Sequence, residues 1–344
     1  MIISEERGLY CPAGDFHIDA WKPVDRNIIT HAHSDHARAG SKRNLAAADG
    51  EKLLRLRLGS DAVIDAIRYG ETIEQRGVKI SLHPAGHVLG SAQVRVEHEG
   101  RVCVVSGDYK RQADSTCALF EPIRCHEFIT ECTFGLPIYH WPAVERVAEE
   151  MNAWWRENAS LGRTSILLGY SLGKSQRMMS LLDPTIGPIL LHGSVLNLTQ
   201  AYRDSGVRLP PAEHASVENA KLYRGKALVI APPSVMQATW IRKFAPVSVA
   251  MASGWMMIRG NRRRRGVDRG FVLSDHVDFD DLLRTISETG AEHIIATHGY
   301  TTALTRLLGE RGIHATSTRT EWVGDEDQAM VAEQDAMPEP AMFA

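Results

Sequence analysis

Short apolar runs that alternate with polar positions dominate the first third of the chain. Successive side chains of an extended segment point to opposite faces, so each run predicts a half-buried strand. Glycine and acidic residues, which favour turns, bound the runs. The runs lie at residues 16–21, 27–30, 78–84, 92–98, 101–108 and 127–131. This part of the chain therefore predicts a strand-rich, layered domain.

The pattern changes near Pro142. Residues 143–158 place apolar side chains at helical spacing, and the apolar run 164–170 leads into a helix predicted over 173–182. Further apolar runs alternate with helical or turn-forming segments, at residues 188–194, 227–233 and 247–255. The alternation predicts a second, α/β region. Residues 270–300 predict a strand, a loop, a helix and a strand, and their pattern of apolar runs is similar to that of the first third of the chain.

Length and composition agree with a globular protein. The chain has 344 residues with 44% hydrophobic content, which is enough for more than one simple domain. Glu5, Glu6 and Arg7 stand where a signal peptide needs apolar residues, and no stretch approaches the roughly 18 apolar residues of a membrane span. We therefore expect a cytoplasmic protein without membrane contact. Its five cysteines form no C-x-x-C pair, which argues against a thiolate zinc site.

Charge is distributed unevenly along the chain. The formal net charge is -3, so a polyanion would have to bind at a local basic patch. Residues 259–269 contain six arginines and predict either a solvated, flexible loop or such a patch. Residues 324–344 contain six acidic residues and no lysine or arginine, which predicts a disordered tail. The segment "GYSLGKS" lacks the glycine spacing of a phosphate loop.

Candidate chemistry is concentrated in the segment "NIITHAHSDHARAG". His31, His33, Asp35 and His36 follow an apolar pair within six positions. Crowded histidines repel one another when protonated and need partners when buried and neutral, and a bound metal ion satisfies both demands. Side chains two positions apart share a face in an extended segment, so His31 and His33 can bind one metal and Asp35 with His36 a second.

Three later strand ends or loops supply the remaining ligands. His87 follows Gly86 in a tight loop, while Asp108 and His298 each follow an apolar strand. We assign the first metal to His31, His33 and His87. The second metal is assigned to Asp35, His36 and His298, with Asp108 as a carboxylate bridge. We expect two divalent metal ions, with zinc as the first expectation and manganese as the alternative.

This H-x-H-x-D-H motif, with the later ligands, resembles the metallo-β-lactamase superfamily. "TECTFG" with Glu131 and "VLSDHVDFDDL" with His276 resemble two motifs of its β-CASP nucleases, in which an α/β domain is inserted between them. The resemblance implies an α/β protein with the four-layered αββα metallo-β-lactamase fold and an inserted β-CASP-like domain. It places the first domain at residues 1–135 and 263–323 and the insertion at 136–262, followed by the tail at 324–344.

Longer stretches, including "HPAGHVLGSAQ", "VVSGDYKR" and "TECTFGLP", resemble the bacterial ligase-associated DNA damage response exonucleases. Cys132 stands where that family has serine. The resemblance implies a metal-dependent DNA exonuclease in DNA repair, with a DNA ligase and a helicase as partners. It also implies that Asp35, Glu131 and His276 are catalytic.

Within that set, His276 is expected to be the proton donor and Glu131 to orient it. Outside that set, Asp19 is expected to support the metal loop. His298 is more typical of β-CASP members that act on RNA, so an RNA-processing nuclease remains the alternative. A small-ester metallo-hydrolase and a non-catalytic scaffold are less favoured, because neither accounts for Glu131 and His276 beside a full ligand set.

Overall fold

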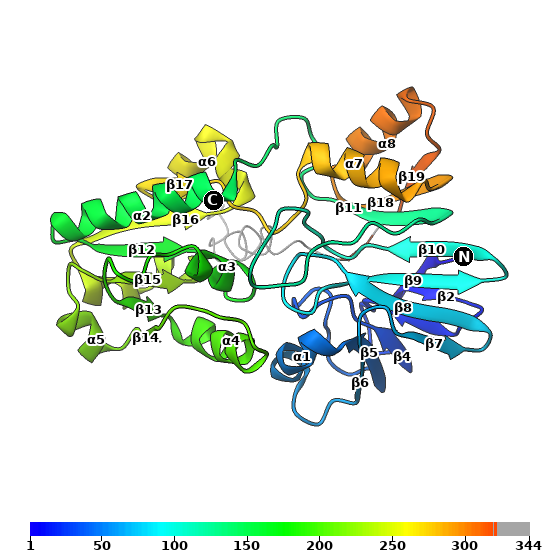
Figure 1. Ribbon diagram of the computed structural model, residues 1–344, viewed down its shortest axis with the longest axis horizontal. Coiled ribbons are helices and arrows are strands. Elements are labelled where there is room, and N and C mark those ends of the chain that lie inside the picture. The colour runs from blue at the N-terminus through cyan, green and yellow to red at the C-terminus, as the bar shows by residue number, and fades with distance from the viewer. Residues whose placement is uncertain (319, 322–344) are drawn as a thin grey trace, which may run out of the picture.

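The computed structural model of the chain describes residues 1–318, 320 and 321. These residues form three sheets, of which two pack face to face and the third makes up a second lobe with its own helices (Figure 1). The first sheet runs in chain order through β1 (Ile3–Glu5), β2 (Gly8–Cys11), β3 (Phe16–Ile18), β4 (Arg26–Ile28), β5 (Arg43–Ala47) and β6 (Ile64–Ile67).

The second sheet combines strands that are far apart in the chain. Its order is β19 (Ala315–Ser317), β18 (His293–Gly299), β11 (Glu127–Cys132), β10 (Arg101–Val105), β9 (Ala92–His98), β8 (Val78–Pro84) and β7 (Thr72–Gln75). β11 pairs in parallel with both β10 and β18. The inner faces of the two sheets share one apolar core, to which Phe16, Ile28, Ile80 and Val94 belong. The alternating pattern of these strands follows from having one face in this core.

Helices cover the outer faces of this sandwich. On the first sheet, Leu53 of α1 (Glu51–Leu58) belongs to a cluster with Ala46 of β5. On the second sheet, α7 (Phe279–Thr289) and α8 (Thr301–Glu310) bury Leu282 and Leu304 against strand residues such as Phe128. The layers are therefore helix, sheet, sheet and helix, which confirms the four-layered αββα architecture expected from the sequence (Figure 1).

The third sheet is parallel throughout. Its order is β14 (Glu213–His214), β13 (Ile189–Leu191), β15 (Leu228–Ala231), β12 (Thr164–Leu168), β16 (Val247–Ala252) and β17 (Arg269–Phe271). Its helices are α2 (Val144–Ser160), α3 (Lys174–Ser180), α4 (Gly193–Asp204), α5 (Val217–Leu222) and α6 (Arg259–Arg264). Residues of α2 and α3 join one apolar cluster and those of α5 another, so the central strands are buried on both faces. This explains their continuous apolar runs.

β17 differs from the sequence expectation. The stretch 270–300 was assigned to the returning first domain, but β17 pairs in parallel with β16, with Ala252 opposite Phe271. The third sheet therefore continues past the boundary expected at residue 262. A three-residue strand carries no periodicity that identifies its partner, and Phe271 is held in place by packing against Trp154 of α2. The proposed boundaries at 135/136 and 262/263 remain proposals.

Short 3-10 helices complete the described elements: η1 (Ala48–Gly50), η2 (Pro233–Gln237), η3 (Thr239–Phe244) and η4 (Gly254–Met257). The arginine-rich segment, for which a flexible loop was one interpretation, forms the helix α6, where Arg263 and Arg264 are exposed. No helix of the described residues combines the length and apolarity needed to cross a membrane. The acidic tail predicted at 324–344 lies outside the described residues.

Two glycines shape the loop between β8 and β9 that carries His87. Gly86 and Gly90 have φ values of +75° and +76°, a region that side-chain-bearing residues rarely adopt. A Cβ at Gly86 would lie 2.2 Å from the carbonyl oxygen of Lys110, and one at Gly90 would lie 2.1 Å from the Cα of Gly50. The loop therefore presses directly onto two backbone segments, which leaves it little freedom to move.

Gly90→Ala should lower the free energy of unfolding by about 3 kcal/mol, because the new methyl group meets backbone atoms and the left-handed conformation is strained. Gly70→Ala is the matched control. Gly70 has a φ of +78° but nothing within 4 Å of its Cβ position, so only the conformational cost of about 1 kcal/mol applies. Urea unfolding of both variants measures the difference. Equal destabilisation would show that the close approach at Gly90 is not rigid.

Candidate metal centre

The histidine-rich segment 31–36 lies directly after β4, where the chain leaves the first sheet. His31, His33, Asp35 and His36 are each at most 4% exposed. Burial of four such side chains within six positions is costly unless each has a partner. The loop therefore has to be organised around an interaction that satisfies several polar atoms at once.

Histidines from two loops and a carboxylate from a third meet at one point. His31, His33, His87 and Asp108 each offer one ligand atom, and these atoms all lie within 4.8 Å of one another. The ring centroids of His31 and His33 are 4.7 Å apart, and His87 lies 4.8 Å from His31 and 4.9 Å from His33. The structure thus brings together the three histidines assigned to the first metal and the carboxylate assigned as the bridge.

The two oxygens of Asp108 face different histidines. Oδ2 lies 3.6 Å from Nε2 of His31 and 3.7 Å from Nε2 of His87, while Oδ1 lies 3.6 Å from Nε2 of His36. Asp35 lies on the His36 side, with Oδ2 at 3.6 Å from the same Nε2 atom. A carboxylate placed between two sets of ligand atoms is the arrangement that a bridge between two metal ions requires.

The hydrogen bonds of His33 and His87 show that a cation fits between them. Nδ1 of His87 donates to the carbonyl of Asp275 at 2.7 Å, and Nε2 of His33 donates to the carbonyl of Leu172 at 3.2 Å. In neutral imidazoles the other nitrogens, Nε2 of His87 and Nδ1 of His33, both carry lone pairs, and they are 3.0 Å apart. Nε2 of His31 is buried without a hydrogen-bond partner. These atoms are suited to bind a metal ion.

The pKa shifts also favour a metal ion. Burial lowers the pKa of His31 and of His87 well below the ordinary value, with further lowering by neighbouring histidines, so both rings are neutral as metal ligands must be. His36 is different. Burial opposes its protonation, but Asp108, Asp35 and Asp19 outweigh burial and raise the pKa of His36 to about 10. The carboxylates thus attract one positive charge, which a metal ion can provide in place of the proton.

Asp19 supports the side of the cluster that is assigned to the second metal ion. Its Oδ2 accepts a hydrogen bond from Nδ1 of His36 at 2.7 Å, which turns Nε2 of His36 toward Asp108. The backbone N–H and the hydroxyl of Thr30 both donate to Asp19, at 2.7 and 2.6 Å. This is the supporting role that the sequence suggested for Asp19, and carboxylate contacts of this kind fix the orientation of a ligand histidine.

A second pair of side chains lies beside the cluster. Nδ1 of His276 is 2.8 Å from Oε2 of Glu131 and 3.0 Å from Oε1, and both residues are 2% exposed. Burial by itself raises the pKa of Glu131. The ion pair with His276 and a hydrogen bond from Thr133 outweigh burial and lower this pKa below its ordinary value, so Glu131 is ionised. Ligand atoms of Asp108, Glu131 and His276 lie within 4.8 Å of one another, and the ring of His276 is 4.9 Å from that of His87.

His298 occupies an irregular position near the end of β18. Glu131 pairs with Thr297 and Cys132 pairs with Gly299, so His298 is the extra residue of a β-bulge. Its φ is +47°, and its Nε2 is buried without a hydrogen-bond partner. The thiol of Cys132 contacts the His298 carbonyl at 3.1 Å, so cysteine at this position retains a contact with the bulge. His298 is in neither tight group found among the described residues, and its assignment to the second metal remains a proposal.

Sequence reasoning missed the backbone carbonyls that orient two of the histidines. The carbonyls of Leu172 and Asp275 accept hydrogen bonds from His33 and His87 across 139 and 188 positions of the chain. A backbone carbonyl has no sequence signature, so no motif could have identified Leu172. For Asp275, the only signal was its position next to His276 in the motif "SDH".

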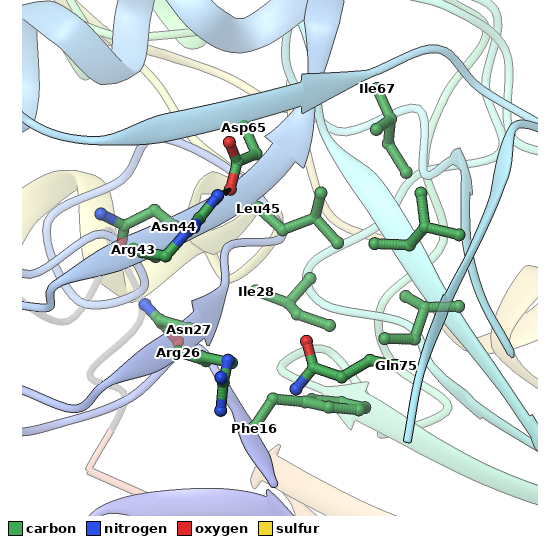
Figure 2. A pocket seen from close by; sticks show the side chains of 12 residues that line it. Phe16, Arg26, Asn27, Ile28, Arg43, Asn44, Leu45, Asp65, Ile67 and Gln75 are labelled. Carbon is green, nitrogen blue, oxygen red and sulfur yellow. Dashed lines mark hydrogen bonds and ion pairs between the residues drawn. The ribbon is translucent and has the colours of Figure 1, made fainter. Parts of the chain in front are cut away.

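A separate pocket lies elsewhere in the sandwich. It has a volume of about 410 Å³, and Figure 2 shows apolar side chains such as Ile28 and Leu45 beside polar ones such as Arg26 and Gln75. Arg43 and Asp65 at this pocket form an ion pair at 2.9 Å. It shares no residue with the histidine cluster, so the candidate chemistry is not located there.

Comparisons with known proteins show what the whole chain is similar to. No family model matches the chain. A protein of Opitutus terrae named probable DNA ligase is 30% identical over 334 residues, which are 96% of this chain and 32% of that protein. The endoribonuclease ysh1 of Schizosaccharomyces pombe is 26% identical, over 71% of this chain and 39% of its own. The chain thus spans about a third of the length of these relatives.

Two further comparisons concern a shorter stretch of the chain and the fold. Cleavage and polyadenylation specificity factor subunit 3 of Dictyostelium discoideum is 30% identical over 35% of this chain and 16% of its own. A solved structure from Enterococcus faecalis, of unknown function, has a TM-score of 0.58 at 12% identity and covers 85% of this chain and 78% of that one, which shows the fold alone. The similarities to the first two relatives support a metallo-β-lactamase/β-CASP nuclease family for this chain.

The buried ligand cluster predicts that the purified protein holds about two divalent metal ions per chain. Asp108→Asn should lower the occupancy of both sites, because its two oxygens face both sets of ligands. Asp25→Asn, at an exposed ion pair with Lys42, is the control and should leave the metal content unchanged. Elemental analysis measures both variants. A well-folded wild-type protein that takes up neither zinc nor manganese would contradict the assignment.

Proposed function

We propose that this chain is a metal-dependent exonuclease that hydrolyses phosphodiester bonds of DNA in a repair pathway. The observation that carries the proposal is the buried group of His31, His33, His87 and Asp108 directly beside the His276–Glu131 pair. A metal site alone would suit many hydrolases. A histidine held by a carboxylate at its edge adds a proton donor, which the cleavage of a phosphodiester bond needs for its departing oxygen.

The roles of the residues follow from their hydrogen bonds. Divalent ions bound at this site would supply an activated water and stabilise charge on the phosphate oxygens. His31, His33 and His87 would hold the first ion, while Asp35, His36 and His298 would hold the second and Asp108 would contact both. In this scheme Asp35 contributes to catalysis by binding the second ion next to the attacked phosphate.

Proton donation is assigned to His276. Its Nδ1 faces the ionised Glu131, so Nε2 is the atom left to hand a proton to the departing 3' or 5' oxygen. Glu131 favours the protonated imidazole through its negative charge and also fixes the ring orientation. The backbone N–H of Tyr109 and the hydroxyl of Thr133 donate to Glu131, which keeps its carboxylate in place.

DNA is favoured over RNA by the extent of the similarity. The relative named probable DNA ligase matches 96% of this chain, whereas the endoribonuclease ysh1 matches 71%. The metal ligands, including His298, would hold ions that contact the phosphate, which DNA and RNA share. Discrimination must therefore come from contacts to the 2'-hydroxyl or to backbone shape, made outside the metal shell. The similarity to ysh1 makes an RNA-processing nuclease the second candidate.

The proposed partner is a DNA ligase. In the relative from Opitutus terrae, the region similar to this chain makes up 32% of a protein named probable DNA ligase. An enzyme that trims DNA ends would prepare ends that a ligase joins, so attachment of the two on one chain supports a shared pathway. A helicase partner rests on the sequence resemblance alone. Zinc as the metal and the cytoplasm as the location belong to the same proposal.

The substrate proposal predicts that the protein shortens linear DNA from an end, releases small nucleotide products and leaves a closed circular single strand largely uncut. Oligonucleotides of one sequence, made as DNA and as RNA and labelled at either end, test this on a gel. Asp108→Asn is the control for contaminating nucleases. Faster cleavage of RNA than of the matching DNA would favour the second candidate, and rapid cutting of the circle would exclude an exonuclease.

His276→Ala should separate proton donation from metal binding. Loss of a general acid lowers the rate by about 10² to 10⁴-fold, while the metal content should stay at the wild-type level because His276 is not assigned as a ligand. His83→Ala is the control, since His83 is outside the cluster. Cleavage rates on the same oligonucleotide and elemental analysis give the two readouts. An unaltered rate would remove His276 from the mechanism.

A further inference from the structure

A buried cluster of charged side chains joins the two lobes next to the metal centre. α3 supplies Lys174 and Arg177, the loop after β10 supplies Lys110 and Asp114, and the turn before α7 supplies Asp275. Their side chains are between 0% and 6% exposed. The mechanism proposed above gives none of these five residues a role.

The contacts converge on Asp275. Nζ of Lys174 lies 3.3 Å from Oδ2 of Asp275, and Nη1 of Arg177 lies 3.2 Å from Oδ1. Asp114 completes the cluster, with Oδ2 at 2.6 Å from Nζ of Lys110 and 3.5 Å from Nε of Arg177. Three cations thus face two carboxylates without access to water. Such clusters gain little stability over apolar residues of the same size, so a role in positioning has to be considered.

The α3 cations also fix the backbone before Asp275. Nζ of Lys174 donates to the carbonyl of Leu273 at 3.0 Å, and Nη1 of Arg177 donates to the carbonyl of Ser274. The next carbonyl along the chain, that of Asp275, accepts the hydrogen bond from Nδ1 of His87 at 2.7 Å. Three successive carbonyls are therefore held, two by the α3 side chains and the third by a candidate metal ligand.

The start of α3 makes the second connection. The carbonyl of Leu172, two positions before Lys174, accepts the hydrogen bond from Nε2 of His33 at 3.2 Å. Between them, Gly173 has a φ of +82°, and a Cβ at this position would lie 2.3 Å from Cγ1 of Val88. The α3 segment thus presses against the loop that carries His87. The carbonyls of Leu172 and Asp275 thus orient His33 and His87, whose Nδ1 and Nε2 atoms face each other at 3.0 Å.

We propose that this charged cluster positions the first metal site. Lys174 and Arg177 bind the Asp275 carboxylate and the carbonyls of Leu273 and Ser274, which fixes the Asp275 carbonyl that orients His87. The same contacts hold the start of α3 in place, where the Leu172 carbonyl orients His33. The inference rests on the proposed metal site and adds a role for the second lobe in it. A ligand histidine whose other ring nitrogen is hydrogen-bonded has a fixed tautomer and orientation, and loss of such partners costs about 10 to 100-fold in metal affinity. Lys174 is accordingly a positioning residue.

Zinc affinity of the full chain tests the proposal, measured by competition with a chromophoric chelator after the metal has been removed. Lys174→Met should weaken binding of the tighter zinc ion about 10 to 100-fold. It should also shift the absorption bands of the cobalt-substituted protein, because the histidine geometry changes. Lys174→Arg keeps the charge and the donors and should recover most of the affinity.

Arg111→Met is the matched control. Arg111 is adjacent to Lys110 and forms a 2.6 Å ion pair with Glu288 of α7, away from the hydrogen bonds that orient His33 and His87. Its zinc affinity and cobalt spectrum should match those of the wild type. Equal weakening in Arg111→Met and Lys174→Met would overturn the proposal, because any lost ion pair in this region would then suffice.

A measurement on the wild type keeps the proposal testable if Lys174→Met fails to fold. In the zinc-loaded protein, NMR should show an Nδ1–H on His87 and an Nε2–H on His33, both slow to exchange with water. The opposite tautomers would overturn the proposal. Unchanged zinc affinity in a folded Lys174→Met protein would also overturn it while the proposed function stands. A wild-type protein without any metal affinity would overturn both.

Discussion

The structure depends on one buried cluster of histidines and carboxylates that requires positive charge at its centre. Carboxylate oxygens of Asp108 face histidines on both sides, and Nδ1 of His33 lies 3.0 Å from Nε2 of His87. In an interior with little water, such an arrangement is stable only when positive charge lies between the groups. The high pKa of His36 expresses the same demand. The fold around the cluster supplies a rigid backbone, so these histidine and aspartate side chains cannot rotate away from one another.

Each layer contributes to that rigidity in its own way. β4 and β10 deliver the histidine segment and Asp108 from two facing sheets, and the glycines at 86 and 90 allow the His87 loop to lie against neighbouring backbone. The bulge at His298 turns this residue out of the regular alternation of β18. Placing such residues at strand ends rather than in long loops keeps the geometry independent of loop motion.

The sequence predicted what is encoded locally. The alternating runs located β8, β9, β10 and β11, the helical spacing located α2, and the H-x-H-x-D-H spacing pointed to a segment whose histidines the structure buries in one cluster. Contacts between distant segments could not be predicted in this way. The pairing of β17 with β16, the helical form of the arginine-rich segment, and the carbonyl contacts of His33 and His87 depend on which surfaces meet in three dimensions. Lys174 illustrates this limit. The segment "GYSLGKS" around it lacks the glycine spacing of a phosphate loop, but only the tertiary structure shows the ion pair between Lys174 and Asp275.

The parallel pairing of β11 with β18 determines when during synthesis the site can exist. Glu127–Cys132 leaves the ribosome long before His293–Gly299, and the whole third sheet is made in between. Such long-range pairing requires closure of a large loop and is slow to form. Glu131 and His276 lie on opposite sides of the third sheet in the sequence. A nascent chain therefore carries most of the candidate metal ligands before it carries the proposed proton donor, and the His276–Glu131 pair can form only once synthesis has passed the third sheet.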